Sequence, residues 1–342
     1  AKDKMETSAY STYNRILPYF KDMLDKNSNN ASEYWKKEVS GFDYMFEAPP
    51  SIINKLRDHC YHLTGESPYA YRSHHEYKSG QFKSKLNLLE KLTDKDLFVS
   101  EPNILGGFGF DFNQKKVNKD TLKFFECMIS MNSSGVLDNL INEAPVPTIC
   151  EIGAGWGGFA HYYLTLFPDS KYIIVDLPET LIFSYIFLSE IFPNKKISLY
   201  EYENTSIKDC DILLIPNGSF NNYHENINLG INICSFQEMT SSQVSGYTKK
   251  LSALNCKYLY SLNRDLNKNN ESLDNKVSSL IAKEYKISDN PVLNIPYTNL
   301  NINNNSNDGF IFKLKIIIKY ILRRNTDSTI NYAYKHIIGI KK

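Results

Sequence analysis

Four closely spaced glycines mark the stretch of the sequence best suited to bind a ligand. They lie between two apolar runs, and their spacing contains G-x-G-x-x-G: Gly153, Gly155, Gly157 and Gly158. Because glycine has no Cβ, a ligand can approach the backbone closely there, and a helix that begins at these residues presents its positive N-terminus to the ligand. Taken alone, the pattern is the fingerprint of a dinucleotide-binding turn.

Two acidic residues near the glycines narrow the choice of cofactor. Asp176 ends the next apolar run, where an acid typically accepts hydrogen bonds from ribose hydroxyls. Glu151 precedes the first glycine inside the predicted strand, where a carboxylate would repel a pyrophosphate but attract the ammonium and sulfonium groups of S-adenosylmethionine. Together with the glycines, Asp176 therefore indicates an adenosine-bearing cofactor, and Glu151 favours S-adenosylmethionine over NAD or FAD. The alternative for Glu151 is a capping role at the end of a strand.

A known family carries the same motifs. E-x-G-x-G-x-G is the glycine motif of class I S-adenosylmethionine-dependent methyltransferases, and the stretch 151–157 matches it. With "EIGAGWGG" and "IIVDLPET", the segments "INICSFQEM" (231–239) and "KYLYSLNRD" (257–265) resemble the sugar O-methyltransferase family found in bacterial polysaccharide gene clusters. The stretch that follows the fourth strand in that family is matched by Asn232, Ser235, Phe236, Glu238 and Met239. The resemblance covers residues 100–265.

The resemblance implies an activity. It implies methyl transfer from S-adenosylmethionine to a sugar hydroxyl in capsule or O-antigen type polysaccharide biosynthesis, with S-adenosylhomocysteine as product. The acceptor would be a sugar nucleotide, a glycan or a lipid-linked saccharide. Residues 153–156 would line the methionine end, 176–177 the ribose, 217–219 the adenine and 232–233 the methionine carboxylate. The full expected cofactor set is Glu151, Gly153, Ala154, Gly155, Trp156, Asp176, Leu177, Asn217, Gly218, Ser219, Asn232 and Ile233.

A sugar hydroxyl is a poor nucleophile at neutral pH, so a general base or a metal ion must assist the transfer. Glu238, which follows the predicted fourth strand, is the first candidate, with a carboxylate at a helix N-terminus as its alternative role. His224 in the loop "NNYHEN" is the second, and a solvent-exposed histidine is its alternative. His75, beside His74 in the polar stretch "YRSHHEY", is the third. His59 and His62 lie in an apolar helical pattern that favours core packing, and the metal ligands, if a divalent metal takes part, are not identified.

The elements that must position these residues change character along the chain. Five stretches with helical spacing precede the glycines: 10–26, 31–39, 50–63, 81–92 and 118–131. The last has Asp120 or Thr121 as a plausible cap. From 147 onward, short apolar runs alternate with helical stretches, which is typical of a parallel sheet covered by helices. We therefore predict an α/β fold, with a Rossmann-like methyltransferase sheet and a mainly helical N-terminal domain.

The predicted domains are a helical, acceptor-binding domain (1–135), a methyltransferase domain (136–312) and a basic C-terminal tail (313–342). Near the start of the tail, apolar residues at every second position suggest a last strand: Phe310, Phe312, Leu314 and Ile316. Basic residues spaced four apart instead suggest the basic stripe of an amphipathic helix: Lys315, Lys319 and Arg323. The stripe would either be solvated or contact an anionic membrane surface.

Composition bounds the class of partner and the compartment. A net charge of +1 gives no basic field for nucleic acid. The 6 cysteines are scattered, which favours reduced thiols over a disulfide framework. The charged start has no apolar segment of a signal peptide, and no run is long enough for a spanning helix. We expect a cytoplasmic protein, with contact at the inner face of the membrane if the tail binds lipid; the oligomeric state is not indicated.

Two other functions compete with methyl transfer. G-x-G-x-x-G taken alone would suit a NAD(P)-dependent oxidoreductase that acts on a sugar nucleotide. A non-catalytic scaffold in glycan assembly would keep the fold without its chemistry, but the intact Glu151 and Asp176 argue against this.

Overall fold

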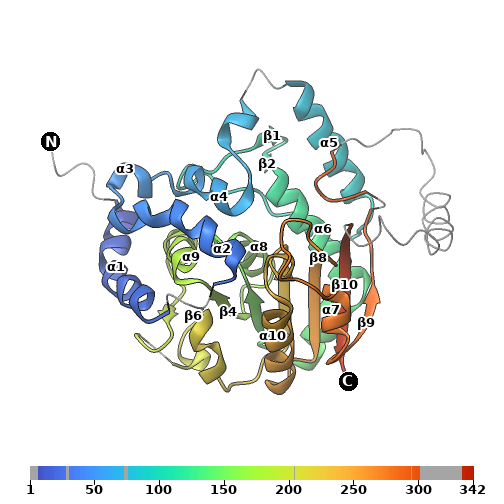
Figure 1. Cartoon of the computed structure of the whole chain (residues 1–342). Coiled ribbons are helices and arrows are strands. Elements are labelled where there is room, and N and C mark those ends of the chain that lie inside the picture. Colours follow the sequence, from blue (N-terminus) through green and yellow to red (C-terminus); the bar gives the residue numbers. More distant parts are fainter. Residues whose placement is uncertain (1–6, 28–30, 73–75, 204, 294, 301–332) are drawn as a thin grey trace.

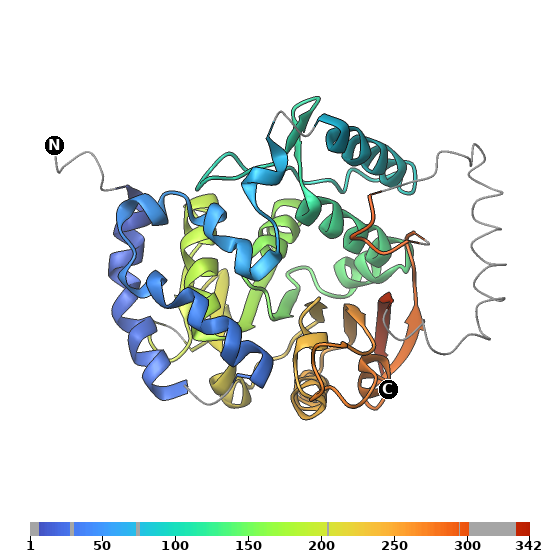
Figure 2. The same ribbon diagram turned by 45° about the horizontal axis from the view of Figure 1, so that its top comes forward.

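The computed structural model describes residues 7–27, 31–72, 76–203, 205–293, 295–300 and 333–342. A central sheet has helices on both faces, and the helical N-terminal region lies across one end of it (Figures 1 and 2). The predicted α/β fold with a mainly helical N-terminal region is confirmed.

The sheet has eight strands in the order β5-β6-β4-β3-β7-β8-β10-β9. The first six strands in this order, from β5 across to β8, pair in parallel. β10 is antiparallel to both of its neighbours, β8 and β9. The parallel, Rossmann-like sheet that the sequence predicts is present, and the chain order reverses between β3 and β7, which opens a crevice beyond the carboxyl ends of these strands. The strands are β3 (Thr148–Ile152), β4 (Lys171–Asp176), β5 (Ile197–Leu199), β6 (Ile212–Pro216), β7 (Leu229–Ile233), β8 (Tyr258–Arg264), β9 (Tyr285–Asp289) and β10 (Tyr334–Lys341).

Successive residues of the buried strands serve two separate apolar cores, because adjacent side chains on a strand point to opposite faces. Ile174 of β4 belongs to the core that also holds α8 and α9, whereas Ile173 packs with α10 and α11. Strands buried on both faces must be apolar at nearly every position, which explains the continuous apolar runs of the sequence. The covering helices are α8 (Gly158–Leu166), α9 (Pro178–Ile191), α10 (Ser241–Ala253) and α11 (Val277–Ile281).

The last described residues belong to the predicted basic C-terminal tail (313–342). Within that range, β10 lies inside the sheet between β8 and β9. Ile337 and Ile338 are buried there, so the strand gains two hydrogen-bonded neighbours and apolar cover. The alternation at 310–316 and the basic stripe at 315–323 lie outside the described residues. No helix in the described part of the chain is long and apolar enough to cross a membrane.

Between its two longer helices, α1 and α5, the N-terminal region consists of short helices and 3-10 turns. The single helix expected over 50–63 is instead broken into three pieces, with Pro50 at the first position of the first piece. The elements are α1 (Ser8–Asn27), α2 (Glu33–Val39), η2 (Ser40–Glu47), α3 (Pro50–Ile53), η3 (Leu56–Cys60), α4 (Tyr61–Thr64), η4 (Pro68–Tyr71) and α5 (Glu76–Glu90). α1 packs along α9, which joins this region to the sheet domain.

A hairpin and two helices connect the N-terminal region to β3. They are β1 (Phe110–Phe112), β2 (Lys115–Val117), α6 (Lys119–Ser133) and α7 (Val136–Glu143). The N-cap of α6 is Asn118, and not Asp120 or Thr121 as expected. The Asn118 side chain accepts a hydrogen bond from the Thr121 backbone N–H. In return, the Thr121 hydroxyl accepts a hydrogen bond from the Asn118 backbone N–H. This capping box fixes the start of the helix that carries Lys123. All six cysteines are free thiols, and five of them are buried.

Candidate functional site

The glycine loop makes a sharp left-handed turn between β3 and α8. Gly153, Gly155 and Gly157 have φ angles of 75°, 59° and 82°, and α8 begins at the next residue, Gly158. Residues with a Cβ rarely adopt such angles, so the turn requires glycine. The loop therefore ends the strand and exposes its backbone at the crevice between β3 and β7.

Two of these glycines face different surroundings. A Cβ on Gly153 would lie 2.0 Å from the Ser235 Oγ, so the loop packs directly on the residues that follow β7. A Cβ on Gly155 would meet no atom within 4 Å. Gly153 thus provides close packing, whereas Gly155 keeps the cavity beside the loop open.

This difference predicts contrasting effects of alanine. We expect Gly155→Ala to cost about 1–2 kcal/mol of unfolding free energy for its positive φ, and to weaken S-adenosylhomocysteine binding at least ~10-fold because the methyl group enters the cavity. Gly153→Ala should cost about 2–5 kcal/mol, since overpacking against Ser235 adds to the backbone strain. Urea denaturation and calorimetric titration measure both effects. Equal destabilisation by the two substitutions, with unchanged binding for Gly155→Ala, would contradict this account.

The cavity lies at the carboxyl ends of the central strands and has a volume of about 440 Å³. Its floor comes from the sheet domain, and its opposite wall comes from α2 and α4 of the N-terminal region. The floor residues include Glu151, Gly153, Ala154, Gly155, Trp156, Asp176, Leu177, Asn217, Ile233, Glu238 and Arg264. The wall residues include Tyr34, Trp35, Glu38, Tyr61, His62 and Thr64. The expected acceptor-binding region and the expected cofactor residues therefore share one cavity.

Asp176 holds the glycine loop from the neighbouring strand. Its carboxylate accepts from the Gly155 backbone N–H at 2.7 Å and from the Leu177 backbone N–H at 2.8 Å. Burial raises its pKa to about 6, and the two backbone hydrogen bonds oppose the shift. Asp176 is therefore mostly ionised at pH 7 and, because each carboxylate oxygen can accept more than one bond, it can still bind hydroxyl groups.

Glu151 is buried at the end of β3, 2% exposed. The Tyr172 hydroxyl donates to its Oε2 at 2.9 Å. Burial raises the pKa of Glu151 to about 8; the Tyr172 bond and Lys123 oppose the shift, and the charge of Asp176 adds to it. A cation bound against this carboxyl would favour its charged form.

Glu238 lies in η8 (Phe236–Glu238), which follows β7, and lines the cavity. Burial raises its pKa to about 8, although Arg264 and a hydrogen bond from the Trp35 side chain favour the charged form. The Ser32 hydroxyl donates to the Glu238 backbone carbonyl at 2.9 Å, so the N-terminal region holds this turn directly. A carboxyl group whose pKa lies near neutrality suits proton transfer.

Sequence reasoning missed several residues of the cavity. Lys123 lines it from α6 and forms an ion pair with Asp120 at 3.0 Å. His62, expected in the core, lines the cavity and is exposed. Tyr297 and Tyr334 also line it, from the C-terminal part of the chain. None of these positions carries a local motif, because their approach to the glycine loop is created by tertiary packing.

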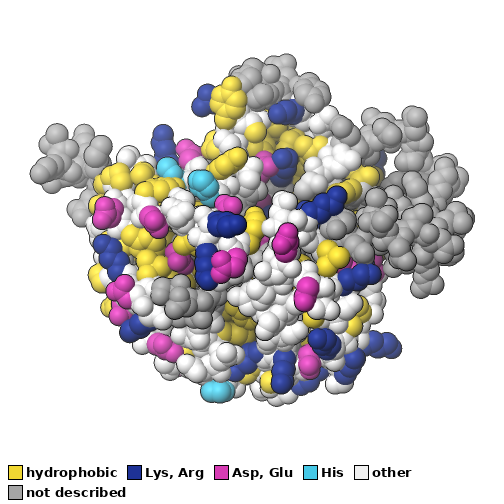
Figure 3. Space-filling model, viewed as in Figure 1, with side chains coloured by type: hydrophobic (Ala, Val, Ile, Leu, Met, Phe, Trp, Pro, Cys, Tyr) yellow, Lys and Arg dark blue, Asp and Glu magenta, His cyan; other side chains and the backbone are white. Residues whose placement is uncertain are grey.

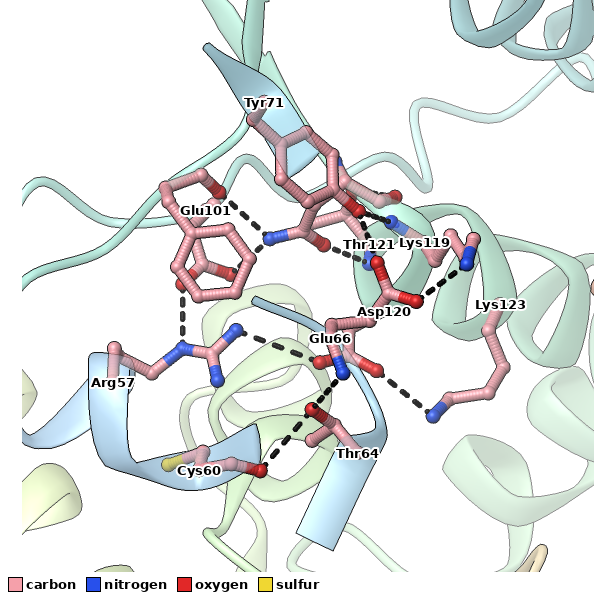
Figure 4. A network of polar contacts seen from close by, with 12 residues as sticks. Arg57, Cys60, Thr64, Glu66, Tyr71, Glu101, Lys119, Asp120, Thr121 and Lys123 are labelled. Carbon is pink, nitrogen blue, oxygen red and sulfur yellow. Dashed lines mark hydrogen bonds and ion pairs between the residues drawn. The ribbon is translucent and has the colours of Figure 1, made fainter. Parts of the chain in front are cut away.

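A buried charge network joins Lys123 to Arg57 through Asp120 (Figure 4). The fully buried Arg57 donates from Nε to Glu101 at 2.7 Å and pairs with Asp120 at 3.5 Å. Its guanidinium also lies 3.6 Å from the centroid of the Trp156 ring. The N-terminal region therefore supports both Trp156 and, through Asp120, Lys123.

Several expected site residues lie elsewhere. Asn232 is fully buried, where it donates to the Ile152 carbonyl at 2.7 Å and accepts from the Phe236 N–H at 2.9 Å, so it joins β3 to η8 and does not line the cavity. Gly218 and Ser219 are not among the lining residues, because the turn η7 (Asn217–Asn222) brings only Asn217 to the cavity. His224 is exposed on the segment that leads down to β7, away from the cavity lining.

Two further expectations concern the histidine pair and the metal. His75 lies outside the described residues, as does His74. In the described part of the chain, no group of three or more histidine, cysteine, aspartate or glutamate side chains is arranged to hold a metal ion.

The chain is similar in fold to solved methyltransferase structures. Geranyl diphosphate methyltransferase in complex with S-adenosylmethionine is 14% identical, with a TM-score of 0.39 over 66% of this chain and 90% of its own. A candidate O-methyltransferase from Nostoc punctiforme PCC 73102 is 9% identical, with a TM-score of 0.36 over 97% of this chain and 95% of its own. Magnesium protoporphyrin IX methyltransferase from Synechocystis PCC 6803 is 10% identical, with a TM-score of 0.34 over 68% of this chain and 87% of its own. No protein-family model and no curated protein matches the sequence.

Proposed function

We propose that the protein is an S-adenosylmethionine-dependent methyltransferase that methylates a sugar hydroxyl. The observation that carries the proposal is a pair of acids on either side of a glycine loop that opens into the cavity: the buried Glu151 and the partly buried Asp176. When bound, S-adenosylmethionine supplies a methyl group on a sulfonium centre with a neutral leaving group. The protein has only to hold this group and to position and deprotonate the acceptor.

The residues present fit the cofactor. Glu151 would bind the ammonium group, and Asp176 would accept from the ribose hydroxyls. Lys123, which also acts electrostatically on Glu151, would bind the methionine carboxylate. This assignment replaces Asn232, whose side chain is engaged within the core. Opposite charges on the protein thus meet both charges of the amino-acid end.

Binding should release a proton from Glu151. Below a pKa of about 8 the free carboxyl is largely protonated, whereas a bound ammonium favours the carboxylate, so affinity should rise about tenfold per unit between pH 6 and 7. It should level above about pH 8, where the free carboxyl of Glu151 is already largely ionised. Calorimetry in buffers of different ionisation enthalpy measures the released proton, and Glu151→Gln should abolish both the release and the rise. A pH-independent affinity in the unmodified protein would contradict this assignment.

The acceptor side of the cavity combines rings with carboxylates. Trp35, Tyr34 and Tyr61 line it from the N-terminal wall, and Tyr297 and Tyr334 line it from the other side. Flat rings can stack on the faces of a sugar, and the carboxylates of Glu38 and Glu238 can accept from its hydroxyls. The resemblance of "SFQEM" to the sugar O-methyltransferase family supports the same acceptor.

Glu238 is the proposed general base. Its carboxyl lies at the end of β7, where the acceptor would meet the methyl group, and its pKa of about 8 makes its basic form available near neutral pH. The Trp35 side chain that donates to it belongs to the acceptor wall, so the same contact orients the base and shapes the site.

The proposed acceptors are a sugar nucleotide, a glycan or a lipid-linked saccharide for a bacterial surface polysaccharide, methylated in the cytoplasm or at the inner face of the membrane. Acidic and basic side chains are mixed on the face viewed in Figure 3, and the net charge is +1. Such a surface does not favour nucleic acid as the acceptor.

Incubation with labelled S-adenosylmethionine tests the proposal. The acceptors would be a panel of nucleotide sugars and glycan extracts, and mass spectrometry would identify the methylated product. A methyl group on a carbohydrate oxygen is the expected result. Label found only on a non-carbohydrate acceptor would overturn the sugar assignment and leave the methyltransferase assignment intact.

A further inference from the structure

Arg264 is the charged residue that ends β8 at the edge of the cavity. Its Nε donates to the Gln237 side-chain oxygen at 3.3 Å, and its backbone N–H donates to the same oxygen at 3.0 Å. Its guanidinium lies 5.2 Å from the centroid of the Tyr334 ring. One edge of the guanidinium is thus held, and one face lies near an aromatic ring.

The rest of the guanidinium has no anionic partner in the described part of the chain. Among those residues, no carboxylate lies within ion-pair distance of Arg264, and its two terminal nitrogens donate no hydrogen bond. Glu238 acts on it electrostatically without forming an ion pair. The other cationic side chain of the cavity, Lys123, differs because it pairs with Asp120 at 3.0 Å.

A partly buried guanidinium without an anionic partner favours an anionic ligand. Burial of a charge is costly unless the charge is paired. The planar fork of arginine matches carboxylate and phosphate oxygens, often with two parallel hydrogen bonds. Because Gln237 occupies only Nε, the terminal N–H groups are left for such a contact.

The position of Arg264 assigns this anion to the acceptor and not to the cofactor. β8 is separated from β3 by β7, which places their ends about 10 Å apart. Lys123 acts on Glu151 at the β3 end, and Arg264 acts on Glu238 and Tyr34. Cys234, which follows β7, lies between the two cations, and both act on it electrostatically. The charge of Arg264 therefore faces the part of the cavity where the base and the aromatic wall meet.

We propose that the acceptor is an acidic sugar, whose carboxylate or phosphate group binds to Arg264. This inference rests on the proposed function, since it describes the acceptor of the same site. The anion would dock the sugar against the aromatic wall and present its hydroxyl to Glu238. A uronate and a sugar phosphate or nucleotide sugar supply the same chemistry, so the test must separate them.

Binding of simple sugars to the S-adenosylhomocysteine-loaded protein tests the inference. The probes are glucuronate, glucose 1-phosphate, UDP-glucose and neutral glucose. The signal is the heat of binding, measured by calorimetry on the protein with both tryptophans in place. We expect at least one acidic probe to bind about 10–100-fold more tightly than glucose, and the preferred probe to distinguish a carboxylate from a phosphate.

Substitutions show whether Arg264 is responsible. Arg264→Gln should remove the preference for the acidic probe while S-adenosylhomocysteine affinity stays within ~2-fold, and Arg264→Lys should keep part of the preference because it keeps the charge. Lys123→Gln is the matched control. It should weaken the binding of S-adenosylhomocysteine and leave the affinity for the acidic probe unchanged.

Three results would overturn the inference. They are the absence of any acidic preference in the unmodified protein, an unchanged preference in Arg264→Gln, and a loss of S-adenosylhomocysteine affinity in Arg264→Gln with the acidic preference intact. Failure of the unmodified protein to bind S-adenosylhomocysteine would instead contradict the proposed function. The same probe titrations, carried out in the absence of S-adenosylhomocysteine, would still test Arg264.

Discussion

Replacement of Glu238 by glutamine should lower kcat about 10²–10⁴-fold, the contribution typical of a positioned general base. The carboxyl lines the cavity beside Arg264 and the Trp35 side chain, and its pKa is about 8. Glutamine keeps the size and one carbonyl oxygen but cannot take the proton. Steady-state rates with the acceptor identified by mass spectrometry measure the loss.

The pH profile separates a basic role from a packing role. The base must be deprotonated to act, so in the unmodified enzyme the rate should rise with pH up to about 8 and then level. Glu238→Gln should lose this limb and keep S-adenosylhomocysteine affinity. Glu38→Gln is the matched control, since Glu38 lines the same cavity from α2. If Glu238→Gln keeps kcat within ~3-fold, another group is the base, and His62 is the next residue to test.

Replacement of Arg57 by methionine should reduce the free energy of unfolding by about 3–5 kcal/mol. Arg57 is fully buried, pairs with Glu101 and Asp120 and lies against Trp156. Methionine fills much of the volume but leaves the buried Glu101 carboxylate without its cation and Asp120 with Lys123 but not Arg57 as a cationic partner, and this uncompensated charge causes the loss. Chemical denaturation measures the change.

An exposed ion pair provides the control for Arg57. Arg15 pairs with Glu203 at 2.9 Å, and 55% of its side chain is exposed, so Arg15→Met should cost only about 0–1 kcal/mol. The double replacement Arg57→Met with Glu101→Met should recover part of the loss, because it removes a carboxylate together with the cation. A cost below ~1 kcal/mol for Arg57→Met alone would show that the network does not stabilise the fold.

The same substitution should affect the cofactor end of the cavity. Because Arg57 packs on Trp156 and pairs with Asp120, its loss should loosen both the glycine loop and Lys123. S-adenosylhomocysteine affinity should therefore fall together with stability, whereas Arg15→Met should leave the affinity unchanged.

Local patterns predicted the parallel strands β3, β4, β6, β7 and β8, whereas the stretch that forms β5 suited either a strand or a helix end. The turn after β3 needs positive φ at Gly153, Gly155 and Gly157, which only glycine adopts readily, so the sequence shows it directly. Asp176 follows an apolar run that is buried on both faces, so its place at the strand end was also predictable. In both cases the signal lies within a few consecutive residues.

Features that depend on distant partners were not predictable in this way. β10 pairs with β8 and β9, which lie far away in sequence, so its short apolar run gave no indication that it enters the sheet. Asn232 follows the strand pattern of a site residue, but a carbonyl and an N–H group inside the core engage its amide. Lys123 and His62 reach the cavity only because separate helices pack over the sheet.

A titration with two competing cofactors tests the central claim most directly. Calorimetry should show S-adenosylhomocysteine binding to the unmodified protein, at least ~10-fold weaker binding to Glu151→Gln, and no binding of NAD. Binding of NAD without S-adenosylhomocysteine would contradict the account, because the buried carboxyl of Glu151 would then lie against a pyrophosphate and not against a cation.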